Sequence, residues 1–83
     1  MNFSVVIPVF NEEHRLQKTA NEIFTFFAKQ SSPVEIIFVD DGSTDNTLSL
    51  LRQYANQHAC KVISYGENRG KGYAVRQGAL AAT

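Results

Sequence analysis

Short runs of apolar residues alternate along this chain with stretches in which apolar positions recur every three or four residues. The runs are rich in β-branched and aromatic side chains and apolar on both faces, which is typical of strands buried in a parallel sheet. The stretches between them have the spacing of amphipathic helices. The expected strands are Phe3–Ile7, Val34–Val39 and Lys61–Tyr65, and the expected helices run over Glu12–Lys29, from Ser43 or Thr44 to about His58, and from Lys71 or Gly72 to the chain end.

This alternation predicts an α/β fold, in which right-handed crossovers place helices against a parallel sheet. We expect Pro8, which has no backbone N–H, to end the pairing of the first strand. Asn11 is the expected N-cap of the first helix. The expected buried stripe of that helix consists of Leu16, Ala20, Ile23 and Phe27, widened by Phe24 and Phe26.

Composition narrows the class of protein. With 83 residues the chain is long enough for one small domain, and its ordinary apolar content excludes a disordered chain. The formal net charge is zero, so the total charge gives no footprint for nucleic acid or an acidic membrane. Cys60 is the one cysteine, which excludes an intramolecular disulfide and a zinc-ligand set and favours a cytoplasmic location. No segment is long enough to span a bilayer.

The turns after the three expected strands carry the candidate chemistry. Parallel strands end at one edge of a sheet, so the turns Phe10–Glu12, Asp40–Ser43 and Gly66–Gly72 should share one crevice. In α/β folds such a crevice is where ligands bind.

Several side chains in these turns suit a nucleotide. Phe10 offers a flat face for a base, while Asp41 and Glu12 offer acceptors for a base or a ribose. Lys71, at the start of a helix between two glycines, suits a phosphate. Each residue also has a structural interpretation: Phe10 as a core aromatic, the Asp40–Asp41 pair as a turn and cap, Glu12 as compensation of the helix dipole, and Lys71 as a solvated cation.

Common alternatives fit less well. Gly66–Lys71 has one residue too few between its glycines for a P-loop, and no Ser or Thr follows the lysine. Gly70–Val75 begins like a dinucleotide fingerprint but ends in Val75 where a small residue belongs, and it follows the third strand rather than the first. Receiver domains carry paired acids after strand one, whereas Asp40 and Asp41 end the second strand.

The chain contains three longer motifs, namely Ser4–Glu13 (SVVIPVFNEE), Ile37–Asp45 (IFVDDGSTD) and Asn68–Arg76 (NRGKGYAVR). In order and spacing they resemble the opening of the family-two, inverting glycosyltransferases, and the match covers almost the whole chain. The third motif is most similar to the branch that moves a sugar onto dolichyl or polyprenyl phosphate. The resemblance implies half of a GT-A, Rossmann-like fold with three layers and strand order 3-2-1. It also implies a UDP- or GDP-linked sugar donor.

The resemblance assigns candidate site residues as well. In this family the first motif lines the nucleoside pocket, the second acid of the Asp-Asp pair contacts the base, and the third motif borders the nucleotide. Phe10 stands where the family often has Tyr, so the stacking face is kept without the hydroxyl. The implied nucleotide-binding residues are Pro8, Phe10, Glu12, Asp40, Asp41 and Lys71.

The family's catalytic groups come later than this chain extends. Its Asp-x-Asp motif, which holds Mg²⁺ or Mn²⁺ against the diphosphate, and its general base both follow the position of Thr83. Residues 1–83 therefore resemble the N-terminal nucleotide-sugar-binding portion of a glycosyltransferase domain. We expect no catalytic residue, no bound metal and no turnover from this chain alone. The alternative is a non-catalytic α/β module for nucleotide or phosphate binding or for protein interaction.

Two expectations concern partners and location. In the family another strand pairs with strand one, and without it the apolar edge at Val5–Ile7 is open to another chain. We therefore expect a homodimer through this edge. For the longer protein the resemblance implies work at the cytoplasmic face of a membrane.

Overall fold

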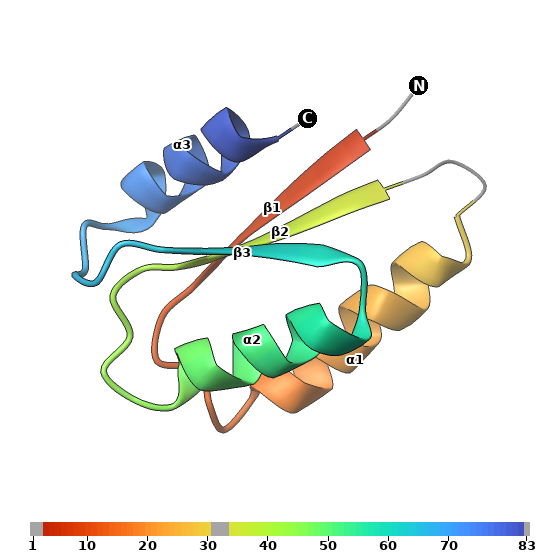
Figure 1. Cartoon of the computed structure of the whole chain (residues 1–83), viewed down its shortest axis with the longest axis horizontal. Helices are drawn as coiled ribbons and strands as arrows, with labels where there is room; N and C mark the ends of the chain where they lie inside the picture. Colours follow the sequence, from red (N-terminus) through yellow and green to blue (C-terminus); the bar gives the residue numbers. More distant parts are fainter. Residues whose placement is uncertain (1–2, 31–33, 83) are drawn as a thin grey trace.

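The computed structural model describes residues 3–30 and 34–82. Within them, strands and helices alternate in the predicted order (Figure 1). None of the helices formed by these residues is long and apolar enough to cross a bilayer. The elements are β1 (Phe3–Val9), α1 (Leu16–Ala28), β2 (Val34–Asp40), α2 (Thr47–Gln57), β3 (Cys60–Ser64) and α3 (Lys71–Ala81).

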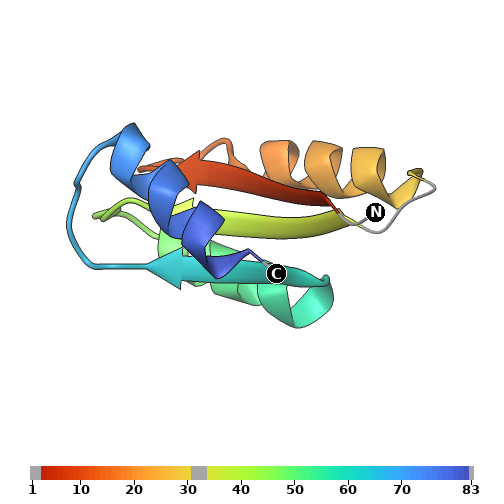
Figure 2. The ribbon, with the colours of Figure 1, turned by 90° about the horizontal axis from the view of Figure 1, so that it is seen from above.

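The three strands form one parallel sheet with β2 in the centre (Figure 2). This arrangement confirms the predicted strand order. Val9 pairs with Asp40, which pairs in turn with Ser64, so the three strands end side by side. Within the described residues β1 is an edge strand. The homodimer through that edge stays a prediction.

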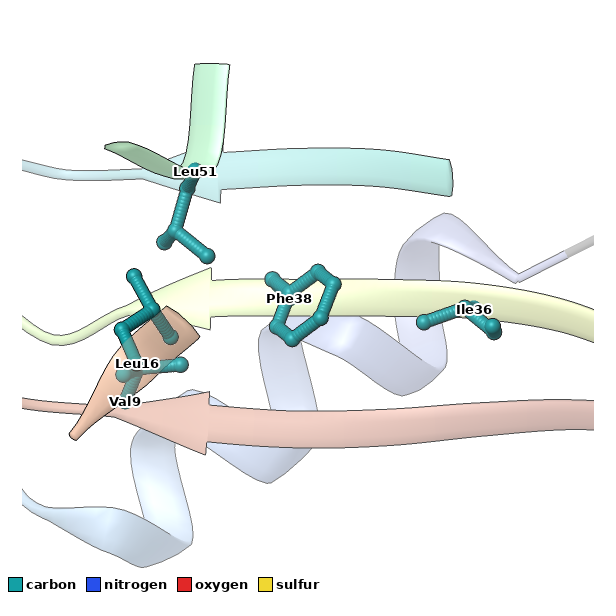
Figure 3. Packing of buried hydrophobic residues seen from close by; sticks show 5 residues of the cluster. All are labelled: Val9, Leu16, Ile36, Phe38 and Leu51. Atoms are coloured by element: carbon teal, nitrogen blue, oxygen red, sulfur yellow. The ribbon is translucent and has the colours of Figure 1, made fainter. Parts of the chain in front are cut away.

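Helices cover both faces of the sheet, as the three-layer prediction requires. α1 and α2 lie on one face and α3 on the other (Figure 1). The alternation of side chains along β2 divides the core accordingly. Ile37 and Val39 pack with Ala74 of α3. Figure 3 shows the cluster on the other face, formed by Val9, Leu16, Ile36, Phe38 and Leu51.

α3 lies very close to the sheet because Gly78 has no side chain. A Cβ at Gly78 would lie 2.2 Å from Val6 Cγ1 and 3.1 Å from Val39 Cγ2. Both distances are shorter than ordinary van der Waals contacts. Gly78 therefore serves the close packing of α3 against the sheet.

The predicted start of α1 at Glu12 is wrong, because the helix begins at Leu16. Asn11 has a φ of +49°, in the left-handed region, and the following residues form a turn in which the Arg15 N–H donates to the Glu12 carbonyl at 2.9 Å. Asn11 does not cap this helix. Its side-chain oxygen accepts from the Thr44 N–H at 2.8 Å instead.

Three further details differ from expectation. β1 continues through Pro8 to Val9, which an edge strand tolerates although proline lacks an N–H. α2 begins at Thr47 rather than at Ser43 or Thr44, because the residues before it are bonded to the first loop. Phe26 is 60% exposed and does not widen the buried stripe of α1. The rest of that stripe is confirmed as buried or partly buried: Leu16, Ala20, Ile23, Phe24 and Phe27.

Candidate functional site

Three loops follow the strands: the first is residues 10–15, the second 41–46 and the third 65–70. Side chains from the second loop and from the first residue of α2 hold the backbone of the first loop. Three successive N–H groups, at positions 11–13, donate to three side chains that alternate along residues 43–47. We call these contacts, with the bond from the Thr44 N–H to Asn11, the loop clasp. The clasp pairs are Asn11 N with Ser43 Oγ (2.9 Å), Glu12 N with Thr47 Oγ1 (2.9 Å) and Glu13 N with Asp45 Oδ2 (3.4 Å).

Asp45 also binds Thr47, the first residue of α2. Its Oδ1 accepts from the N–H of Thr47 at 2.9 Å and from the Thr47 hydroxyl at 2.5 Å. Partial burial alone would raise the pKa of Asp45. The hydrogen bonds from Thr47 and from the Glu13 N–H outweigh burial and lower the pKa below its usual 3.8. The ionised carboxylate is therefore the form that holds the clasp.

Asp41 holds the third loop. Its carboxylate is 4% exposed and accepts four hydrogen bonds from residues 65–70. Oδ1 accepts from the Tyr65 hydroxyl (2.5 Å) and the Arg69 N–H (2.9 Å), and Oδ2 accepts from the Asn68 amide (3.1 Å) and the Gly70 N–H (3.1 Å). One side chain therefore fixes the backbone from which α3 begins.

These contacts shift two pKa values. Burial alone would raise the pKa of Asp41, but the hydrogen bonds from Tyr65, from Arg69 N–H and from Gly70 N–H lower it below its usual 3.8. Burial and the bond to charged Asp41 raise the pKa of Tyr65 above its usual 10.0. At neutral pH the pair is a phenol donor and an ionised carboxylate.

Gly42 allows the third loop to lie on the second. Its φ is +73°, and a Cβ there would lie 2.2 Å from the Asn68 backbone nitrogen and 2.2 Å from the Glu67 carbonyl carbon. Backbone atoms cannot make way for a methyl group without moving the chain. The glycine after the acid pair is therefore required twice, for its conformation and for its lack of volume.

Asp40 plays a different part from its neighbour. It is 1% exposed, and its oxygens accept from the Ser43 N–H and the Ser64 hydroxyl, both at 3.3 Å. These bonds join the ends of β2 and β3. Of the six predicted site residues, Asp40 is the one that does not line the cleft described next.

A cleft of about 540 Å³ opens at this edge of the sheet and gathers all three loops. Phe10 lies at its border with 42% of its surface exposed. Glu12 is bonded to Arg15, at 2.6 Å between charged atoms, on the surface of the chain. The residues lining the cleft are Pro8, Val9, Phe10, Glu12, Asp41, Asn68, Gly70 and Lys71.

The third side of the cleft is the start of α3. Gly70, with a φ of +92°, is the N-cap residue, and Lys71 is the first residue of the helix. Free N–H groups at a helix start and a lysine beside them attract anions. The cleft thus has an aromatic face and carboxylates on one part of its wall and a cationic corner on another.

A divalent cation does not fit the described residues. Within 3–30 and 34–82, no three His, Cys, Asp or Glu side chains come together as a metal-binding group. The oxygens of Asp40 and Asp41 are bonded to donors of the chain itself. In this arrangement the two carboxylates hold the loops.

Sequence reasoning missed the residues that hold the loops together. Tyr65 and Asn68 received no role, although both donate to Asp41. The signal for the clasp was present in the alternation of Ser43, Asp45 and Thr47, three short polar side chains two positions apart. Their partners are backbone N–H groups, which carry no sequence signal.

Comparison with known proteins finds one family. The family model described as "Glycosyl transferase family 2" matches residues 4–83. A dolichyl-phosphate beta-glucosyltransferase of Drosophila melanogaster is 39% identical over 90 residues, covering 99% of this chain and 28% of the relative. The chain thus spans about a quarter of the length of the curated relatives it matches. The predicted resemblance to the dolichyl-phosphate branch is confirmed by this similarity.

Two solved structures show the fold with bound donors. The mannosyltransferase PcManGT from Pyrobaculum calidifontis, in complex with GDP-Man and Mn²⁺, matches with a TM-score of 0.81 and 30% identity over 98% of this chain and 24% of its own. S. aureus TarS in complex with UDP-GlcNAc matches with a TM-score of 0.68 and 35% identity over 93% of this chain and 23% of its own. These matches confirm the predicted GT-A-type fold.

Proposed function

This chain belongs to glycosyl transferase family 2, and from that premise we propose that residues 1–83 form the nucleotide-sugar-binding portion of a glycosyltransferase domain. The observation that carries the proposal is the cleft at the carboxyl edge of the sheet. Five of the six residues assigned from the resemblance line it, although they come from three segments far apart in the sequence. Turns meet at this edge in any parallel sheet, so the support comes from their chemistry: an aromatic ring, carboxylates and a lysine share one cleft.

Each part of the cleft suits one part of a nucleotide. Phe10 presents an exposed aromatic face on which a base can stack. Asp41 and Glu12 place carboxylates in the wall of the cleft, and carboxylates are the acceptors that suit donors on a base or a ribose. Lys71 and the start of α3 suit the diphosphate. The donor is a UDP- or GDP-linked sugar, the two kinds named with the structural matches.

The longer protein would supply the remaining chemistry. By resemblance, Mg²⁺ or Mn²⁺ and a general base belong to residues outside these 83, and the acceptor is a polyprenyl phosphate such as the one in the relative's name. We therefore propose that the longer protein acts at a membrane, on its cytoplasmic face. The described residues would contribute binding and orientation of the donor.

The test is an amide NMR titration of this chain with UDP and, separately, GDP. Without a metal site we expect weak binding, roughly millimolar, or about 4 kcal/mol. Shifts should concentrate in the three loops that line the cleft. Phe10→Ala should weaken binding at least about fivefold, because base stacking on an aromatic ring is worth about 1–3 kcal/mol.

Phe26→Ala is the matched control, since Phe26 is also an exposed phenylalanine but lies on the outer surface of α1. It should bind as the wild type does. If neither nucleotide shifts any cleft residue in a well-folded spectrum, the proposal fails for this chain. A response to inorganic phosphate equal to that of UDP would favour the alternative, a phosphate-binding module without base recognition.

A further inference from the structure

The carboxylate of Asp41 lines the cleft but has no acceptor position left for a ligand. An ionised carboxylate offers about four lone-pair sites. The hydroxyl of Tyr65, the amide of Asn68 and the N–H groups of Arg69 and Gly70 occupy four such positions. A base N–H that binds Asp41 must therefore replace one of the chain's own donors.

The four donors differ in how readily they can leave. Tyr65 is half-buried, and its ring packs edge-on against Tyr73 at 4.8 Å between ring centres. The N–H groups of Arg69 and Gly70 belong to the backbone that begins α3, so they move only if the start of the helix moves. Asn68 is exposed, lines the cleft and can leave by rotating about its own side-chain bonds.

We infer that the side-chain amide of Asn68 occupies the place of a base N–H on Asp41, and that nucleotide binding exchanges one for the other. This inference rests on the proposed function and names the residue that the nucleotide displaces in the same cleft. It makes Asn68 a residue that sets the affinity for the nucleotide. The carboxylate of Asp41 selects the base, because it favours bases that carry a ring N–H on their pairing edge, as uracil and guanine do. It disfavours cytosine, whose unprotonated ring nitrogen would face the carboxylate.

Exchange also lowers the affinity. The ligand gains one hydrogen bond to Asp41 only after the Asn68 amide gives up its bond to Oδ2 at 3.1 Å and a second bond to the Asp41 carbonyl at 3.3 Å. Removing the amide removes this competition. We expect Asn68→Ala to bind UDP and GDP about three- to tenfold more tightly than the wild type, which corresponds to about 0.7–1.4 kcal/mol.

The experiment is an NMR titration of the 83-residue chain and its variants with UDP, GDP and CDP. The Asn68 side-chain NH₂ signals, identified by their loss in Asn68→Ala, should shift with UDP and with GDP but not with CDP. Asn68→Ser, whose side chain is too short to reach Asp41 Oδ2, should tighten binding in the same direction as Asn68→Ala. Asn56→Ala, at an exposed position of α2, is the matched control and should leave the affinity unchanged.

Two outcomes overturn the inference, and they are distinguishable. If the wild type binds UDP but both Asn68 variants bind it equally or more weakly, then Asn68 supports the site and the exchange is wrong while the proposed function stands. If neither the wild type nor any variant responds to UDP or GDP at millimolar concentration, the proposed function fails for this chain and the exchange fails with it. Binding of CDP as tight as that of UDP would also contradict the exchange.

Discussion

The loop clasp and the third loop are held in opposite ways. In the clasp, three separate short side chains each accept a hydrogen bond from one backbone N–H of the first loop. In the third loop, residues 66–70 depend on the single carboxylate of Asp41 and on the absence of a side chain at Gly42. The clasp should therefore lose its contacts one at a time, whereas the third loop should lose its order in one step.

This difference bears on the proposed site. The clasp positions Phe10 and Glu12, and the third loop positions Lys71 at the start of α3. A change in the clasp should weaken one wall of the cleft and leave the others in place. A change at Asp41 or Gly42 should remove the corner that suits the diphosphate. Substitutions in the two regions should separate these cases, beginning with the largest expected effect.

Gly42→Ala should be the most damaging substitution. The added methyl group meets backbone of the third loop at 2.2 Å in a conformation that already disfavours a side chain, so we expect a loss of more than about 3 kcal/mol in the free energy of unfolding. Gly66→Ala is the matched control, because Gly66 also has a positive φ (+80°) but has no atom within 4 Å of the added Cβ. It should cost about 1 kcal/mol. Urea denaturation measures both losses. Equal losses would show that the close contact between Gly42 and the backbone of the third loop does not add to the cost of the substitution.

Asp41→Asn should have the next largest effect. The amide keeps one acceptor oxygen but turns an NH₂ group toward donors of the third loop, so we expect a loss of about 2–3 kcal/mol. Hydrogen exchange should locate the change, because the amides of Arg69 and Gly70 bind different carboxylate oxygens and one of them loses its acceptor. Glu67→Gln, on the exposed side of the same loop, should leave their exchange unchanged. Faster exchange spread evenly over all six elements would contradict the idea of a locally anchored loop.

Thr47→Val should remove one contact of the clasp together with the hydrogen bond that the Thr47 hydroxyl donates to Asp45. Thr47 is fully buried, and valine keeps its shape while losing the hydroxyl that accepts from the Glu12 N–H. We expect a loss of about 1–2 kcal/mol, with faster hydrogen exchange at Glu12 and little change at Gly70. Thr19→Val, at an exposed position of α1, is the control for the substitution itself. Loss of protection at Gly70 would show that the two regions are coupled.

Acid titration should separate the two regions as well. A carboxylate whose pKa is lower in the folded state contributes stability that is complete above its unfolded pKa and is lost as the pH falls through the folded pKa. Asp41 and Asp45 both have lowered pKa values, so stability should be level near neutral pH and fall below about pH 4. Tyr65, whose pKa is raised, should lose its contribution as the pH rises past about 10.

The acidic fall is checked by urea denaturation across this pH range. Asp41→Asn should remove the part of the fall that belongs to the third loop, and Asp45→Asn the part that belongs to the clasp. The two parts should add, because the carboxylates hold different loops. A fall that persists unchanged in both variants would assign it to other acids of the chain.

Arg15→Ala should have the smallest effect. Arg15 pairs with Glu12 at the surface, and its side chain is 76% exposed. Exposed pairs of this kind contribute little, so we expect a change within about 0.5 kcal/mol, further reduced by salt. A larger loss, measured by the same denaturation, would mean that the pair helps to fix Glu12 in the cleft.

The sequence predicts the fold well, because periodicity and strand composition report burial directly. Ile36–Val39 are all buried at the centre of the sheet, as their continuous apolar run requires. The start of α1 was less predictable, since Asn11 and Glu12 have the residue types of a helix start but lie in a turn held by the second loop. Tertiary hydrogen bonds decided that boundary.

The candidate site likewise has features that the sequence predicts and features that only tertiary contacts decide. The edge at which the loops meet follows from the order of strands and helices, and the resemblance supplied the residue types. The separation of Asp40 from Asp41 was not predictable, because the two acids are identical and adjacent in sequence. Their environments differ only because β3 lies beside β2. The hydroxyl of Ser64 then donates to Asp40, and the hydroxyl of Tyr65 donates to Asp41.

The clasp also bears on the order in which the chain assembles. Its bonds join residues 32 to 35 positions apart, and the bonds to Asp41 from the third loop span 24 to 29. The paired residues of β1 and β2, such as Phe3 and Val34, are 31 positions apart, so the clasp and the sheet close loops of similar length, and both should follow local helix formation. The cleft should therefore acquire its shape together with the sheet, after the helices. A ligand that binds there would recognise only a chain whose sheet and loops are both assembled.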